Sequence, residues 1–269
     1  MRAPLSVCLL ARDEAERLER CLDALDFADE IVVVVDDRSR DATEEVARRR
    51  ASRVERRTYA GDVEQKRYCV SLAKHDWVLV VDPDEVVSEG LAASIRDVLE
   101  RAGRRAGERR TEGSTDVVAW ELDRITWHLG RWIRHGDFHP DWKLRLFRRS
   151  RARFVGRDPH GRVEVDGPVG RLSGELLHYS YRDLGDQIAR IQFFSDQAAA
   201  ALVREGRPFR LRDLVLRPPA RFLRSYLLKR GFRDGLPGFV IAGASAFYVF
   251  LKYAKHWEAT RPRDEGPGD

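Results

Sequence analysis

The stretch WVLVVDPDEVV, residues 77–87, decides the fold class, because it joins an apolar run to a cluster of acidic residues. The run Val78–Val81 is typical of a strand buried on both faces, as in a parallel sheet. It ends in Asp82, Asp84 and Glu85, and carboxylates this close together need a compensating positive charge. The stretch therefore predicts a buried parallel strand that leads into a charged site.

Strand and helix patterns alternate through the first hundred residues. The strand candidates are 5–10, 31–35, 53–59 and 77–81, and the helix candidates are 14–25, 41–51 and 62–73. Strands separated by helices of this length predict right-handed crossovers and a parallel sheet with helices on both faces. From about residue 116 the pattern changes to shorter, mixed strands, and helices return from about residue 183.

The composition is that of a globular protein with one large or two small domains. The chain has 269 residues, of which 43% are hydrophobic, and this is ample for a buried core. Its net charge of +5 suits an anionic partner, although 35% charged residues of both signs are also ordinary solubility chemistry. The cysteines Cys8, Cys21 and Cys69 have no metal-ligand spacing, which favours a reducing compartment. The N-terminus lacks a long apolar segment, and we expect a cytoplasmic location.

Acidic residues follow two of the predicted strands. Asp36 follows the 31–35 strand, and Asp82 and Asp84 follow the 77–81 strand. Ligands of open parallel sheets bind outside the carboxyl ends of the strands. Two hard oxygen ligands that leave room for water and phosphate suit Mg²⁺ or Mn²⁺ on a diphosphate. The alternative is that an acid of this group caps the next helix.

Five ordered blocks of sequence resemble one known family. They are LSVCLLARDEAERLERCLDAL (5–25), ADEIVVVVDDRSRDAT (28–43), EQKRYCVSLAKHDWVLVVDPDE (64–85), GRWIRHGDFHPDWKLRLFRR (130–149) and PHGRVEVDGPVGRLSGELLHYSY (159–181). Together they resemble the family 2 glycosyltransferases, which are inverting enzymes of the GT-A fold, and within them the bacterial lipopolysaccharide core glucosyltransferases. The resemblance implies an α/β, Rossmann-like, mostly parallel sheet in a catalytic domain over 1–200, followed by a C-terminal helical segment over 201–269.

The resemblance implies a donor site for a nucleotide sugar, with a UDP-sugar as the first choice. Glu14 matches the glutamate of the family's first-strand motif, and Asp36 matches the aspartate that holds the nucleotide base. Gln65 and Lys66 match a Gln-Lys pair near the donor, although a solvated helix face is the alternative for Lys66. Asp82 matches the first aspartate of the family's metal-binding motif and is expected beside the donor.

The resemblance also implies a divalent cation, Mg²⁺ or Mn²⁺, and a catalytic base. Asp82 and Asp84 match the metal-binding motif, with Asp84 as the direct ligand. His178 or His160 is the candidate that completes the metal shell, and the alternative for each is an ordinary core or surface histidine. Asp141 matches the aspartate that accepts the proton of the acceptor hydroxyl. The family's preceding glutamate is missing here, so a turn aspartate is the alternative.

The C-terminal third combines basic and apolar residues. Residues 204–233 are rich in Arg and Lys, and 236–251 are uncharged, which is shorter than the roughly 20 residues that a spanning helix needs. We expect peripheral binding to an anionic membrane on the inner face of the plasma membrane. The alternatives are a helix packed on the catalytic domain or a homodimer interface.

The predicted function is inverting transfer of a sugar from a nucleotide-sugar donor to a glycolipid or saccharide acceptor, such as a lipopolysaccharide core or a similar envelope glycan. Two other classes compete with it. A GT-A-like nucleotidyltransferase would also need carboxylates and a metal, but it normally has a Gly-rich loop after the first strand. A nonenzymatic protein that binds anions or nucleotide sugars is the second. No nucleic-acid recognition motif is present, and no nucleic-acid partner is expected.

Overall fold

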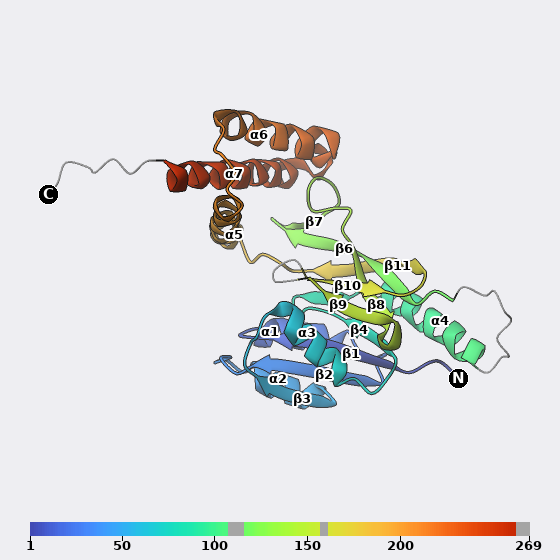
Figure 1. Ribbon diagram of the computed structural model, residues 1–269. Helices are drawn as coiled ribbons and strands as arrows, with labels where there is room; N and C mark the ends of the chain where they lie inside the picture. Colours follow the sequence, from blue (N-terminus) through green and yellow to red (C-terminus); the bar gives the residue numbers. More distant parts are fainter. Residues whose placement is uncertain (107–115, 157–160, 262–269) are drawn as a thin grey trace. The chain divides into compact units, whose positions relative to one another are not determined.

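The computed structural model describes residues 1–106, 116–156 and 161–261 (Figure 1). Contacts divide the chain into two compact units, which are described separately below. Unit 1 comprises Met1–Arg124 and Asp141–His178, and unit 2 comprises Ile125–Pro140 and Tyr179–Asp269. The expected functional division into 1–200 and 201–269 stays a prediction, because contacts do not show which part of the chain is catalytic.

Strands and helices alternate at the start of unit 1, as the sequence predicts. The elements are β1 (Leu5–Ala11), α1 (Ala15–Asp23), β2 (Glu30–Asp36), α2 (Thr43–Arg50), β3 (Arg53–Arg57), α3 (Asp62–Ser71) and β4 (Trp77–Val80). Strands β3, β2, β1 and β4 lie side by side in this order, and each neighbouring pair is parallel. The predicted α/β class is therefore confirmed.

The second half of unit 1 extends this sheet with antiparallel strands. Its elements are β5 (Glu85–Val87), α4 (Glu89–Ala106), β8 (Trp142–Arg148), β9 (Ala152–Val155), β10 (Arg162–Val165), β11 (Val169–His178) and the first part of β6 (Ala119–His128), which continues into unit 2 from Ile125. The sheet continues from β4 in the order β8, β6, β11, β5, while β9 and β10 form a separate hairpin. Strand β8 runs antiparallel to β4, with Leu79 opposite Leu146. The start of β8 therefore lies near the carboxyl end of β4.

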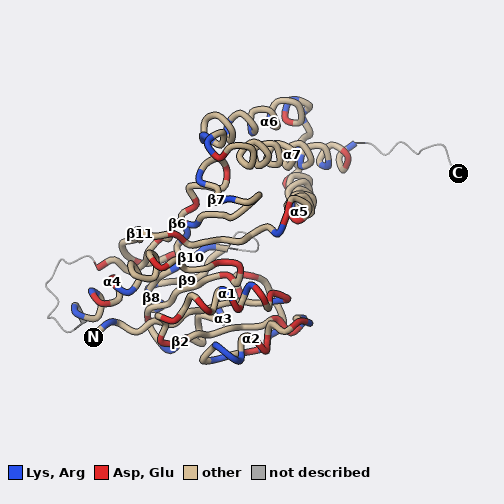
Figure 2. The backbone as a smooth tube through the Cα atoms, turned by 180° about the vertical axis from the view of Figure 1, so that it is seen from behind, with Lys and Arg blue, Asp and Glu red and all other residues tan. Residues whose placement is uncertain are grey.

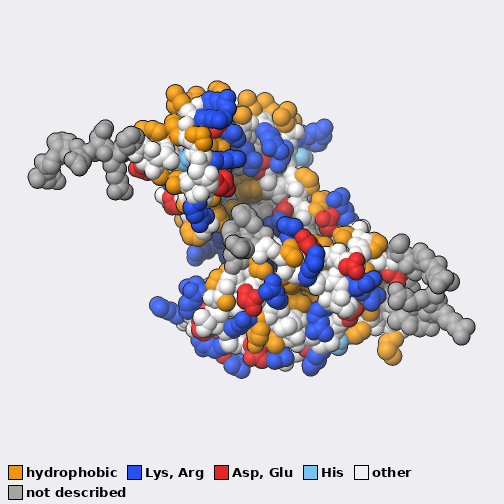
Figure 3. Space-filling model, in the orientation of Figure 1, with side chains coloured by type: hydrophobic (Ala, Val, Ile, Leu, Met, Phe, Trp, Pro, Cys, Tyr) orange, Lys and Arg blue, Asp and Glu red, His pale blue; other side chains and the backbone are white. Residues whose placement is uncertain are grey.

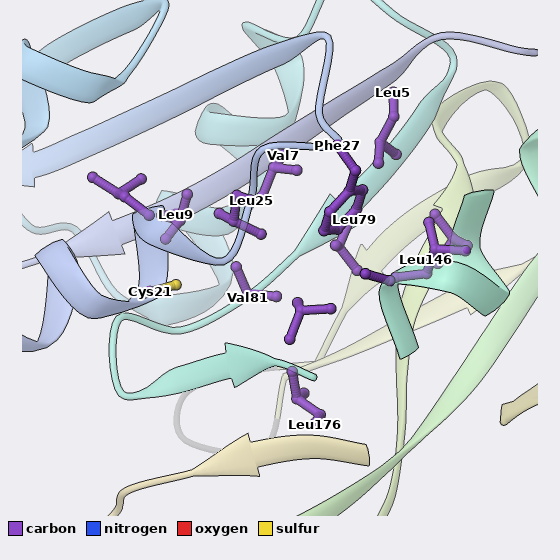
Figure 4. Packing of buried hydrophobic residues seen from close by; sticks show 14 of the residues in the cluster. Leu5, Val7, Leu9, Cys21, Leu25, Phe27, Leu79, Val81, Leu146 and Leu176 are labelled. Carbon is purple, nitrogen blue, oxygen red and sulfur yellow. The ribbon is translucent and has the colours of Figure 1, made fainter. Parts of the chain in front are cut away.

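Alternating side chains of the parallel strands fill two apolar layers. Leu5, Val7 and Leu9 of β1 are fully buried in a layer with α1, α2 and α4, whereas Cys8 is buried in a second layer with α3. Figure 4 shows part of the first layer, including Cys21 of α1. Burial of each large apolar side chain contributes about 1.5–3 kcal/mol, so both layers hold the strand ends in place. Helices therefore cover both faces, as predicted.

Unit 2 is mainly helical. Its helices are α5 (Leu184–Arg204), α6 (Leu211–Leu223) and α7 (Gly235–Thr260), and β7 (Arg131–Ile133) pairs with the end of β6. Helix α7 packs against both α5 and α6, and Figure 2 shows Lys and Arg positions along α6. By length and composition, the segment Gly231–Thr260 can cross a membrane, and 28% of its most apolar window is buried in the protein.

Candidate active site

The acidic cluster after β4 is neutralised largely by an arginine of β8. The Nη2 atom of Arg145 lies 2.6 Å from Asp82 Oδ2 and 2.6 Å from Glu85 Oε1. Glu85 has no exposed surface, and its other oxygen accepts a hydrogen bond from the backbone N–H of Asp82 at 3.0 Å. Although burial raises the pKa of Asp82, Arg145 and Lys66 hold this pKa well below its usual range. Arg145 and Lys66 therefore supply much of the positive charge that the acidic residues after β4 need.

A second arginine links this cluster to Asp141. Nη1 of Arg124 lies 3.0 Å from Glu85 Oε1, and its Nη2 lies 2.7 Å from Asp141 Oδ2. The other carboxylate oxygen of Asp141 is 2.8 Å from Lys143 Nζ. Burial raises the pKa of Asp141, but the hydrogen bond from Lys143 and the charge of Arg124 outweigh it and lower this pKa. Asp141 is thus an ionised carboxylate held by two cations.

Asp84 and His178 lie together on the other side of the cluster. In the antiparallel pairing of β5 with β11, His178 stands opposite Glu85, and its Nε2 is 3.4 Å from Asp84 Oδ2. Glu14 is close enough that burial and then the charge of Asp84 raise its pKa to about 6. Asp84 therefore lies within electrostatic reach of Glu14, which itself contacts Arg17 at 3.4 Å, whereas Asp82 is neutralised by Arg145.

These residues fit a divalent cation as part of its coordination shell. Among the described residues, no group of three or more His, Cys, Asp and Glu side chains is arranged to hold a metal ion. A carboxylate oxygen of Asp84 is nevertheless a suitable ligand for Mn²⁺ or Mg²⁺, and the imidazole of His178 suits the transition metal Mn²⁺ better than Mg²⁺. Mg²⁺ in particular is usually held by one or two carboxylates together with water and substrate phosphates. His160, the other candidate ligand, lies outside the described residues.

Asp36, the expected base-binding residue, is engaged by its own loop. Arg38 donates to both of its carboxylate oxygens, from Nε at 2.9 Å and from Nη2 at 2.6 Å. These hydrogen bonds lower the pKa of Asp36 to about 2. A base bound at Asp36 would therefore have to share this carboxylate with the guanidinium of Arg38.

Gln65 and Lys66 occupy different environments on α3. Gln65 is 2% exposed, and within the described part of the chain its Oε1 has no hydrogen-bond partner. Lys66 is not on a fully solvated face, since its Nζ lies 3.1 Å from Asp62 Oδ2 and 3.7 Å from Asp82 Oδ1. Lys66 therefore lies at the acidic cluster, whereas Gln65, its neighbour in the sequence, is buried.

The fold and this cluster define an α/β protein with a charged ligand site at the carboxyl ends of parallel strands. The model of the family described as Glycosyl transferase family 2 matches residues 6–163, which is more than half of the chain. The chain belongs to this family of glycosyltransferases, and the resemblance in its sequence blocks is confirmed.

Two curated relatives match nearly the whole chain. The lipopolysaccharide core biosynthesis glycosyltransferase LpsC of Rhizobium meliloti (strain 1021) is 27% identical over an alignment of 267 positions, which covers 96% of this chain and 93% of LpsC. An uncharacterized glycosyltransferase of Rickettsia bellii (strain RML369-C) is 27% identical over an alignment of 279 positions, which covers 97% of this chain and 90% of that protein. The similarity therefore extends beyond the family match into unit 2.

One solved structure that the chain matches is the mannosyltransferase PcManGT from Pyrobaculum calidifontis in complex with GDP-Man and Mn²⁺. It is 17% identical to this chain, with a TM-score of 0.49, and the alignment covers 97% of this chain and 89% of PcManGT.

Proposed function

We propose that this glycosyltransferase moves a sugar with inversion from a nucleotide-sugar donor to a glycolipid or saccharide acceptor. The observation that carries the proposal is one continuous edge of charged side chains, which runs from the Asp84–His178 pair through Asp82, Glu85 and Arg124 to Asp141. A donor diphosphate needs positive charge, and an acceptor hydroxyl needs a proton acceptor. This edge offers both within unit 1.

On the donor side, we assign the cation to Asp84, with His178 as a further ligand. A bound Mg²⁺ or Mn²⁺ would stabilise the negative charge that develops on the departing nucleoside diphosphate. Asp82 holds Arg145 and Lys66 in place beside it, and Glu14 adds negative charge that favours cation binding. A UDP-sugar remains our first choice of donor, with the base bound near Asp36.

On the acceptor side, we assign the base to Asp141. Its lowered pKa keeps the carboxylate ionised at neutral pH, and its contact with Lys143 reduces its basicity. The side chain of Lys143 is 38% exposed and can move away without leaving a buried charge unpaired. We infer that the acceptor hydroxyl takes the place of Lys143 at Oδ1, where it delivers its proton to Asp141 as the new glycosidic bond forms.

Asp141→Asn tests the assignment of the base. Because a positioned general base typically contributes 10²–10⁴-fold to the rate, the transfer rate should fall by about this factor while nucleotide binding is retained. The measurement is the transfer of radiolabelled sugar to a glycolipid extract, with a panel of nucleotide sugars. Asp166→Asn, an exposed carboxylate of unit 1, is the control. Near-normal transfer by Asp141→Asn would remove Asp141 from this role, and retention of the anomeric configuration in the product would contradict inversion.

We place the reaction at the inner face of the plasma membrane, because unit 2 combines exposed apolar and basic residues. Leu211, Val215 and Leu216 of α6 are exposed, as are Leu228 and Leu236 near the start of α7. Figure 3 shows hydrophobic side chains over α6 and α7 with Lys and Arg among them. Apolar contact together with basic residues favours an anionic lipid surface. The name of LpsC supports a lipopolysaccharide core or a similar envelope glycan as the acceptor.

A further inference from the structure

A pocket of about 390 Å³ lies in unit 1 beside the acidic cluster, and its wall is strongly cationic. It is enclosed by α3, the adjoining parts of β6 and β8, and the β9–β10 hairpin. The basic lining residues are Lys66, Arg124, Lys143, Arg145 and Arg162. Among the described lining residues, Asp62 carries the only carboxylate. The wall therefore favours a negatively charged ligand.

Most of the carboxylates that pair with these cations are not part of the pocket lining, and the exception is Asp62, which lies 3.1 Å from Lys66 Nζ. Arg145 contacts Asp82 and Glu85, and Arg162 contacts Glu164 through its Nη2 at 2.7 Å. None of these three acids lines the pocket. Asp82 and Glu85 hold the largely buried guanidinium of Arg145 in a fixed orientation, and a guanidinium has five N–H donors, more than one carboxylate uses. This arrangement suits a phosphate or carboxylate group, which accepts several charge-assisted hydrogen bonds at once.

An apolar wall stands beside the cationic one. Trp142, Phe154 and Val63 line the same pocket, and the guanidinium of Arg171 lies 4.5 Å from the centre of the Trp142 ring. The main chain at Gly161 lies close to the side chain of Val63, because a Cβ at Gly161 would lie 2.1 Å from Val63 Cγ2. A pocket with apolar walls and a few fixed charged groups is typical of a site for a small organic ligand rather than for a free ion. A sugar that carries an acidic substituent has both properties.

The position of the pocket relates this ligand to the acceptor. Of the residues placed on the donor side, Lys66 and Arg145 line it, whereas Glu14, Asp36 and Gln65 do not. By contrast, both cations that contact Asp141, the proposed base, belong to the lining. We propose that this pocket binds a phosphate or carboxylate substituent of the acceptor sugar and thereby selects acidic acceptors. The proposal rests on the proposed function, since it needs Asp141 to face the acceptor.

Arg162 and Arg153 form a matched pair for the test. Both are exposed arginines of the same hairpin, at 69% and 77%, and both contact Glu164. Only Arg162 lines the pocket. Loss of one charge-assisted hydrogen bond weakens binding by about 10-fold or more, so Arg162→Ala should lose affinity for the anion and Arg153→Ala should not.

The probe is inorganic phosphate, measured by calorimetry at constant ionic strength with and without saturating UDP or GDP and Mn²⁺. We expect phosphate to bind the wild type and Arg153→Ala alike, about 10-fold more weakly to Arg162→Ala, and to bind also when the nucleotide is present. Nucleotide affinity should be equal in all three proteins. No phosphate binding by the wild type, or equal binding by all three, would overturn the proposal.

Two further outcomes separate this proposal from the others. If phosphate and nucleotide exclude each other and Arg162→Ala weakens nucleotide binding, the pocket holds the donor diphosphate, and the assignment to the acceptor is wrong. If no nucleotide binds but phosphate still binds more weakly to Arg162→Ala than to Arg153→Ala, the pocket does bind anions, and the proposed donor site is wrong.

Discussion

At the scale of single residues, the charges after β4 are held by one guanidinium more than by any other group. Arg145 is 11% exposed and contacts both Asp82, in the turn after β4, and Glu85, at the start of β5. Without this guanidinium, the two carboxylates would repel each other. Removal of one partner from a buried ionic cluster leaves an uncompensated charge, which costs more than the pair contributes. The order of this edge therefore depends on Arg145.

Arg145→Met is expected to reduce the free energy of unfolding by about 3–5 kcal/mol, because Glu85 would be left without its closest cation. Arg148→Met on the same strand is the control. Arg148 is 32% exposed and lies 3.6 Å from Asp76, so its loss should cost no more than about 1 kcal/mol. Urea denaturation monitored by circular dichroism measures both, and equal losses would contradict the role given to Arg145.

The sequence supports a prediction of the acidic residues at the site but not of their partners. Asp36, Asp82 and Asp84 follow apolar runs, so their position at the strand ends is a local property. The approach of Arg145 to Asp82 and of His178 to Asp84 depends on strand pairing across long loops. In the sequence, Arg145 is one of several arginines in the segment 130–149, and the others share its charge. The one local signal was its place between apolar residues of a strand, where a basic side chain needs a buried partner.

At the scale of elements, the alternation of 5–10, 31–35 and 77–81 with amphipathic segments was sufficient to predict the parallel half of the sheet. Those strands are apolar on both faces, and sequential neighbours are joined by helices of standard length. The antiparallel half was harder to predict. Strand β8 lies between β4 and β6, and its place beside β4 follows from contacts distant in sequence. This insertion brings Asp141, which precedes β8, close to the acidic cluster after β4, to which Arg124 links it.

The packing of β11 on α4 depends on a glycine. Gly174 has a φ of +91°, and a Cβ there would lie 2.3 Å from the backbone nitrogen of Leu91. Gly174→Ala should therefore lower the free energy of unfolding by about 1–3 kcal/mol more than Gly130→Ala, which has a φ of +81° but no atom within 4 Å of its Cβ position. Thermal unfolding of the two variants measures the difference. Equal destabilisation would mean that only the backbone conformation matters at Gly174.

At the scale of the whole molecule, unit 1 carries the charged site, and unit 2 carries exposed apolar residues together with basic ones. The exposed leucines of α6 and the incomplete burial of α7 are unusual for the surface of a monomer in water. Sequence composition predicted the basic and apolar character of this region. Composition alone does not decide whether this region binds a membrane, packs on the catalytic domain or forms a dimer interface, because it does not show which apolar residues remain exposed.

Flotation with vesicles tests the membrane proposal. The wild type should float with vesicles that contain about one third anionic lipid at low salt, and be released by alkaline carbonate, as expected for a peripheral protein. Replacement of Leu216, Leu228 and Leu236 by Gln should abolish flotation, while Val169→Gln, an exposed apolar residue of unit 1, should not. Resistance to carbonate would indicate that α7 spans the bilayer. A lipid-independent dimer that remains in the soluble fraction would favour the interface alternative.

The most direct measurement for the whole account is the binding of nucleoside diphosphates, with and without Mn²⁺ or Mg²⁺, to the wild type, Asp84→Asn and Asp166→Asn. The panel contains UDP, GDP, ADP and dTDP, and binding is read as thermal stabilisation, which reaches about 2.7 kcal/mol at 100 times the dissociation constant. We predict that one nucleotide class stabilises the wild type and Asp166→Asn only when the cation is present, and that Asp84→Asn loses this effect. Stabilisation that needs no cation, or that is unchanged in Asp84→Asn, would contradict the assignment of the donor site to this edge.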